Sequence, residues 1–116
     1  MVEQGMNKND QIEEIYKVIK EIEDKNDITQ RDIASRLGYS LGKVNYLIKA
    51  LTNMGIIKLQ NFKKSDNKLG YKYILTSEGI KEKYKITKQF LNRKETEYEK
   101  MQVEIDKLRK EVKSFK

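Results

Sequence analysis

The chain has 116 residues, of which 37% are apolar and 37% are charged, and its formal net charge is +7. This length and apolar content suffice for one compact domain with an extension, and they exclude two full hydrophobic cores. The sequence contains no His and no Cys, so the usual general base, the thiol nucleophile and the common transition-metal ligands are missing. We therefore predict that the protein is not an enzyme and binds no metal or other cofactor.

The first 30 residues combine a polar start with one amphipathic segment. Residues 1–9 are predicted to be a flexible N-terminus, and their polar character does not resemble a secretory signal. The absence of Cys agrees with the cytoplasmic location that we expect. From residue 10 to residue 25 an apolar stripe predicts the first helix of a three-helix core. This stripe contains Ile12, Ile15, Ile19 and Ile22, with Tyr16 and Val18 at its sides.

A short helix is predicted from Thr29 to Leu37. Thr29 supplies a hydroxyl suited to capping the helix, and the apolar residues that follow lie on one helical face. Gly38 comes next, the residue type that most easily takes the left-handed conformation at a helix end, and Ser40 can cap a second helix. Two helices about three residues apart have the spacing of a helix-turn-helix.

The second of these helices has one apolar and one polar side. Val44, Leu47, Ile48 and Leu51 are predicted to point inward. The opposite face carries no acidic residue and consists of Ser40, Gly42, Lys43, Asn45, Tyr46 and Lys49. The N-terminal residues of a recognition helix lie near base edges, so Lys43, Asn45 and Tyr46 are predicted there. The alternative is a solvated helix face that carries lysines.

Gly42 is unusual inside a helix, where glycine costs about 1 kcal/mol relative to alanine. Either its missing side chain allows close approach of a phosphate to the backbone, or glycine is simply tolerated near the helix start.

A basic β-hairpin is predicted after Met54 and Gly55 close the second helix. Residues 56–63 and 71–76 have strand character, and the polar residues and glycine of the segment 64–70 predict a turn. The tip and shoulders of the hairpin carry Lys63, Lys64, Lys68 and Lys72, placed to contact a phosphate backbone. The alternative role for these lysines is protection of an exposed sheet edge, and both roles can hold together.

The positive charge is concentrated on these two elements. Residues 1–30 have a net charge of −4, residues 31–73 one of +7, and residues 74–116 one of +4. Such a distribution predicts double-stranded DNA as the partner, with an affinity that falls steeply as salt rises. No long apolar run and no strongly amphipathic basic helix supports membrane binding.

Residues 77–116 contain no Pro and no Gly after Gly79, which predicts one long helix of about 50 Å or more. Its second half repeats apolar residues every seven positions. The first seam position holds Leu91, Tyr98, Ile105 and Val112, and the other holds Met101, Leu108 and Phe115, with Lys94 breaking the pattern. The alternative is an amphipathic helix that folds back on the domain's own core.

The heptad pattern favours a parallel two-stranded coiled coil, because β-branched residues occupy the first seam position at Ile105 and Val112. In that orientation Glu104 faces the partner subunit's Arg109, whereas an antiparallel pairing brings like charges together. The predicted dimerisation residues are Leu91, Tyr98, Met101, Ile105, Leu108 and Val112. A two-fold homodimer would place two recognition helices about one DNA turn apart, matching an inverted repeat.

The predicted fold is mainly α with a small β-hairpin (α+β): a winged helix-turn-helix at residues 10–77, followed by a C-terminal dimerisation helix at residues 78–116. The stretch IASRLGYSLGKVNYLIKALTNMGIIK, with the hairpin ending YILTSEG, resembles the MarR type of winged-helix transcription regulator. The segments SLGKVNYLIKAL, NFKKSDNK and LTSEGIKEKYKITKQFLNRKETEYEKM are similar to the short regulators of this type associated with exopolysaccharide genes. The resemblance spans roughly residues 10–110.

This resemblance implies a cytoplasmic bacterial DNA-binding regulator, usually dimeric, that acts on a nearby operon. It places the recognition helix contacts at Ser40, Lys43, Asn45, Tyr46 and Lys49, and the wing contacts at Lys63, Lys64 and Lys68. The chain departs from the pattern at Ser77, where Pro is frequent, and we expect Ser77 to cap the last helix. It also lacks the long helices at both ends that form a cleft for phenolic ligands, so we predict no small-molecule effector.

Two other kinds of protein are alternatives for the same pattern. A winged-helix adaptor for protein partners should show mixed charge or an apolar patch on the face where this chain carries lysines. A plasmid or phage replication or partition protein would also bind DNA, and the sequence separates it poorly from a regulator.

Overall fold

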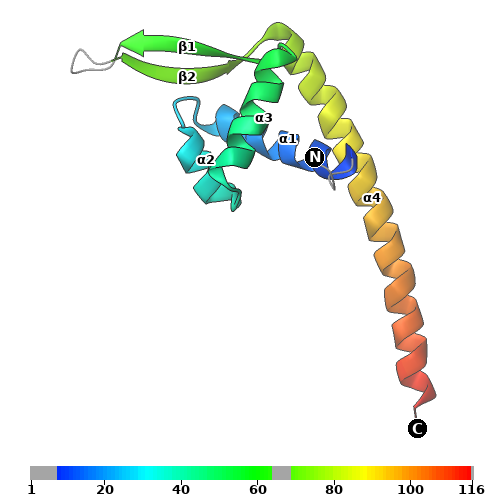
Figure 1. The fold of residues 1–116 in the computed structure, drawn as a ribbon. Helices are drawn as coiled ribbons and strands as arrows, with labels where there is room; N and C mark the ends of the chain where they lie inside the picture. Colours follow the sequence, from blue (N-terminus) through cyan, green and yellow to red (C-terminus); the bar gives the residue numbers. More distant parts are fainter. Residues whose placement is uncertain (1–7, 64–68, 116) are drawn as a thin grey trace.

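The computed structural model describes residues 8–63 and 69–115, and the side chains of residues 11–61 and 71–115 (Figure 1). Along the chain the elements are α1 (Lys8–Asp24), α2 (Gln30–Leu37), α3 (Leu41–Asn53), β1 (Ile57–Lys63), β2 (Leu69–Leu75) and α4 (Ser77–Ser114). Three helices and the hairpin form a small domain, and α4 runs out of it to the C-terminus (Figure 1). The predicted fold of helices with a small hairpin is confirmed.

The core lies between α1, α2, α3 and the base of the hairpin. The predicted inward side of α3 is confirmed, since Val44, Leu47, Ile48 and Leu51 are all buried. Val18 differs from the expectation that it borders the stripe of α1, because it is as fully buried as Ile19. The rest of the buried cluster consists of Ile22, Ile28, Ile33, Ala34, Ile56 and Ile57.

The ends of α2 follow the sequence prediction. The hydroxyl of Thr29 accepts a hydrogen bond from the backbone N–H of Asp32 at 3.0 Å, and the Asp32 carboxylate accepts one from the backbone N–H of Thr29 at 3.4 Å. This reciprocal pair is a capping box. Gly38 ends the helix with φ 74°, in the left-handed region. Ser40 then caps α3 by accepting a hydrogen bond from the backbone N–H of Lys43 at 3.0 Å.

β1 and β2 form a two-stranded antiparallel sheet whose register runs from Ile57 opposite Leu75 to Lys63 opposite Leu69. The turn was predicted to extend to Gly70, but Leu69 and Gly70 belong to β2. The strand begins earlier because backbone pairing continues through Gly70 opposite Phe62, and such pairing needs no particular side chain. The rest of the predicted turn, residues 64–68, lies outside the described residues.

The prediction that Ser77 caps α4 is wrong, because Ser77 is already the first helical residue and Thr76 is the cap. Thr76 has the extended backbone that a capping residue needs, with φ −79° and ψ 170°. Its hydroxyl accepts a hydrogen bond from the backbone N–H of Gly79 at 2.8 Å and donates one to the carbonyl of Gly55 at 2.5 Å. Thr76 therefore ties the start of α4 to the end of α3.

The first half of α4 packs against α1, and its second half extends away from the domain (Figure 1). The rings of Tyr16 and Phe90 lie 5.0 Å apart, and Arg93 forms an ion pair with Glu13 at 3.4 Å. Every residue from Lys94 to Phe115 is exposed. The alternative in which this amphipathic half folds back on the domain's core is therefore wrong.

We expect Thr76→Ala to lower the free energy of unfolding by about 1 kcal/mol, the usual cost of removing a helix cap. Urea denaturation would measure the loss. Ser77→Ala is the matched control, since Ser77 is exposed and its replacement should change stability by less than about 0.5 kcal/mol. A larger loss for Ser77→Ala than for Thr76→Ala would contradict this assignment of the cap.

Candidate functional site

The outward side of α3 is the candidate site suggested by the sequence. Tyr46 is 48% exposed and Lys49 is exposed, on the side of the helix opposite the core. At 3.6 residues per turn, Gly42 and Asn53 fall on the same line. We call Gly42, Tyr46, Lys49 and Asn53 the outer stripe of α3. Asn53 was not among the residues selected from the sequence, although its spacing of seven and eleven from Tyr46 and Gly42 would have identified it.

Lys43 lies at the edge of this stripe and is turned toward α1. Its ammonium forms a close ion pair with the Glu14 carboxylate, and it also lies 4.6 Å from the centre of the Tyr39 ring. The side chain of Glu14 is 13% exposed and that of Lys43 is 31% exposed. Burial raises the pKa of the Tyr39 phenol above its ordinary value.

Asn45 lies at the opposite edge and is turned toward α2. Its side-chain amide donates a hydrogen bond to the Gln30 side-chain carbonyl at 3.2 Å, and the Gln30 amide donates one to the Tyr73 hydroxyl at 3.3 Å. These contacts join α3, the start of α2 and β2. The sequence analysis missed both Gln30 and Glu14. Gln30 is 15 positions from Asn45 and Glu14 is 29 positions from Lys43, and contacts over such separations leave no local pattern in the sequence.

The remaining predicted contacts divide between described and undescribed residues. Ser40 is exposed, and its hydroxyl caps α3. Lys72 is half-buried and lies opposite Gln60 in the hairpin. The backbone of Lys63 pairs with Leu69, while its side chain and all of Lys64 and Lys68 lie outside the described residues.

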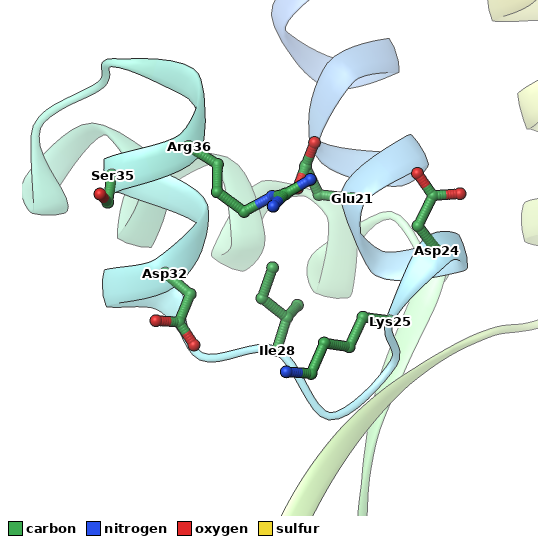
Figure 2. A pocket seen from close by; sticks show the side chains of 7 residues that line it. All are labelled: Glu21, Asp24, Lys25, Ile28, Asp32, Ser35 and Arg36. Atoms are coloured by element: carbon green, nitrogen blue, oxygen red, sulfur yellow. The ribbon is translucent and has the colours of Figure 1, made fainter.

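A pocket of about 470 Å³ lies between the end of α1 and α2 (Figure 2). Its lining consists of Glu21, Asp24, Lys25, Ile28, Asp32, Ser35 and Arg36. The Arg36 guanidinium reaches across to Glu21 and donates a hydrogen bond at 2.5 Å, and this contact raises the pKa of Arg36 further (Figure 2). The lining combines three carboxylates with one ammonium and one guanidinium, and it shares no residue with the outer stripe of α3.

The second half of α4 carries the apolar row predicted from the heptad pattern. Tyr98, Met101, Leu108 and Val112 are more than half exposed, and Ile105 is 39% exposed. Ile105, Leu108 and Val112 line a shallow apolar depression bordered by Arg109 and Lys113. The row is therefore exposed, and no other helix or strand in the described part of the chain covers it.

The family model described as winged helix-turn-helix DNA-binding matches residues 15–58, from the middle of α1 to the start of β1. A comparison with curated protein sequences finds no significant match.

Solved structures share the fold over most of the chain. The S. aureus MepR–DNA complex has a TM-score of 0.56 at 21% identity, covering 90% of this chain and 77% of MepR. A MarR/EmrR family transcriptional regulator from Acinetobacter sp. ADP1 has a TM-score of 0.53 at 20% identity, covering 97% and 80%. The PcaV transcriptional regulator from Streptomyces coelicolor has a TM-score of 0.55 at 15% identity, covering 100% and 81%. These likenesses show that the chain has the winged-helix fold of such regulators.

None of the helices in the described part of the chain is both long enough and apolar enough to cross a membrane. Across residues 8–63 and 69–115, no three acidic side chains lie close enough together to hold a metal ion.

We expect Lys43 and Glu14 to be coupled energetically. In the wild type, Lys43→Ala removes an ion pair that is mostly shielded from water. In the Glu14→Gln variant that ion pair is already absent. Lys43→Ala should therefore lower the free energy of unfolding by about 1 kcal/mol more in the wild type than in Glu14→Gln. Urea denaturation of the two single variants and the double variant measures this coupling. Equal losses in both backgrounds would contradict it.

Proposed function

We propose that this protein is a sequence-specific transcription regulator that binds double-stranded DNA through α3 and the hairpin. The observation that carries the proposal is the exposed outer stripe of α3, the second helix of a helix-turn-helix, which is basic and contains no acid. A recognition helix of this kind enters the major groove. Among the proteins with this fold, MepR has been solved bound to DNA.

In this proposal the exposed side chains of Tyr46 and Lys49 contact base edges in the major groove. Ser40 at the start of α3 lies beside a phosphate, while Asn45 and Lys43 border the contact on either side. Without DNA, the Lys43 ammonium is paired with the Glu14 carboxylate. A contact of Lys43 with DNA therefore exchanges this acidic partner for an acidic group of the DNA. Asn45 reaches a base by exchanging its hydrogen bond with Gln30 for one with adenine.

The hairpin serves as the wing. In the proposed complex it contacts the neighbouring stretch of phosphate backbone. The lysines proposed for this contact are Lys63, Lys64 and Lys68. Contacts of this type add affinity for any sequence and release counterions.

We further propose that two copies associate through the exposed row on α4 as a parallel coiled coil. The charges beside the row support this orientation, since Glu104 faces the partner subunit's Arg109. Two recognition helices related by a two-fold axis then match an inverted repeat, and linking two half-sites raises the affinity of a small module.

The sequence resemblance also supports a proposal for the regulated genes and the cellular location. The similarity of residues 40–51, 61–68 and 75–101 to exopolysaccharide-associated regulators supports control of exopolysaccharide genes in the cytoplasm of a bacterium. The proposal includes no small-molecule effector.

The proposal predicts that the protein binds DNA from its own upstream intergenic region more tightly than a random duplex, with a steep salt dependence for both. Asn45→Ala and Lys49→Ala should each cost about 1–3 kcal/mol on the specific site through loss of base contacts. Lys64→Ala should weaken binding to both duplexes similarly and flatten the salt slope. Fluorescence anisotropy titrations measure all of these.

Lys107→Ala is the matched control, because it removes the same charge from an exposed position on the distant half of α4. It should leave the affinity for DNA nearly unchanged. Binding to neither duplex at moderate salt would overturn the DNA-binding proposal and favour an adaptor for protein partners. Equal losses on specific and random DNA for Asn45→Ala and Lys49→Ala would refute only their role in base recognition.

The dimer is tested by sedimentation equilibrium. Ile105→Asp should convert a dimer to a monomer, because it places two carboxylates in the proposed apolar seam. Val103→Asp is the control, since Val103 is 55% exposed on the same helix but lies outside the seam. A monomeric wild type, or equal disruption by both substitutions, would rule out the proposed coil.

A further inference from the structure

We infer that Gly42 marks the point where bound DNA comes closest to the backbone of α3. The outer stripe of Gly42, Tyr46, Lys49 and Asn53 is then the line of the helix that faces the floor of the major groove. This inference rests on the proposed DNA binding, and it goes further by assigning a binding role to the absence of a side chain.

The glycines of this chain differ in what the fold requires of them. Gly38 and Gly55 have φ 74° and 75°, in the region where other residues are strained. At Gly79 an added Cβ would lie 2.0 Å from the backbone carbonyl oxygen of Ile56, so a side chain cannot fit. At Gly42 an added Cβ would meet nothing within 4 Å, and the backbone is helical.

Within the described part of the chain, the fold therefore does not require glycine at position 42. Glycine weakens a helix relative to alanine, because it loses more backbone freedom on folding and gives no side-chain packing. Because Gly42 weakens α3 and solves no packing problem in its own fold, we take the space that it leaves as room for a partner outside the fold, rather than as glycine simply tolerated in the first turn of the helix.

The position of Gly42 on α3 shows on which side of the helix this free space lies. The core side of α3 holds Val44, Leu47 and Leu51, and Gly42 lies opposite them. On one side of Gly42 the Lys43 ammonium is held by Glu14, and on the other Asn45 is held by Gln30. The side chains that border Gly42 are thus drawn away from it, and the backbone there is open to a partner.

The dimensions of DNA fit this opening. The major groove is about 12 Å wide, and an α-helix with its side chains is about 10–12 Å in diameter. The helix fills the groove, so the residue that points at the floor near the helix start sets how deeply α3 can enter. With no side chain at Gly42, Tyr46 and Lys49 come within reach of base edges one and two turns further along.

The test uses Gly42→Ala and Gly42→Leu in the full chain, with thermal unfolding and DNA titration measured on each variant. Gly42→Ala should raise the Tm by a few degrees, since alanine favours the helix and meets no neighbour. The same substitution should weaken binding to the specific duplex by roughly tenfold, and Gly42→Leu should weaken it further, as α3 is pushed out of the groove.

Ser35→Leu is the bulk-matched control, because Ser35 is exposed on α2 and lines the separate pocket of Figure 2. It should bind DNA like the wild type. Unchanged DNA affinity in both Gly42 variants, with DNA binding by the wild type intact, would overturn the inference alone. A lower Tm for Gly42→Ala would also overturn it, by showing that the fold itself needs glycine there. If the wild type binds no DNA, the proposed function is wrong, and this inference, which rests on it, is wrong as well.

Discussion

The packing of α3 against α1 is the contact on which the rest of the structure depends. Leu47 and Leu51 on α3 are completely buried, as are Val18 and Ile19 on α1. Because a helix is rigid, burying one side of α3 fixes the direction of every other side chain on it. The outer stripe is exposed for this reason, and the side chains at its two edges can reach α1 and α2. The candidate interface is thus a consequence of the core.

α1 also connects the candidate interface to the long helix. Glu14 forms the ion pair with Lys43 of α3, and the preceding residue, Glu13, forms one with Arg93 of α4. Adjacent positions of one helix therefore contact both α3 and α4. The ring contact of Tyr16 with Phe90 also joins α1 to α4. In a dimer formed through α4, this junction would set the separation of the two α3 helices.

Local patterns in the sequence were enough for most of the fold. Apolar periodicity identified the buried side of α3, and capping chemistry placed the starts of α2 and α3 at Thr29 and Ser40. The cap of α4 was misassigned because Thr76 and Ser77 both carry hydroxyls, and only the extended backbone of Thr76 distinguishes them. The turning of Lys43 toward Glu14 could not be predicted, since it depends on how two helices meet rather than on either helix alone.

The exposed half of α4 raises a question of stability that its own residues answer only in part. Starting a helix is its costly step, and here the first half of α4, packed against α1, already supplies that start, so the residues beyond Lys94 only have to continue it. Ion pairs between neighbouring turns, such as Arg93 with Glu97 at 3.0 Å, contribute a few tenths of a kcal/mol each. Apolar neighbours three and four positions apart in the row, such as Ile105, Leu108 and Val112, contribute amounts of the same order. In the proposed dimer a second copy covers this row and adds burial that the single chain lacks.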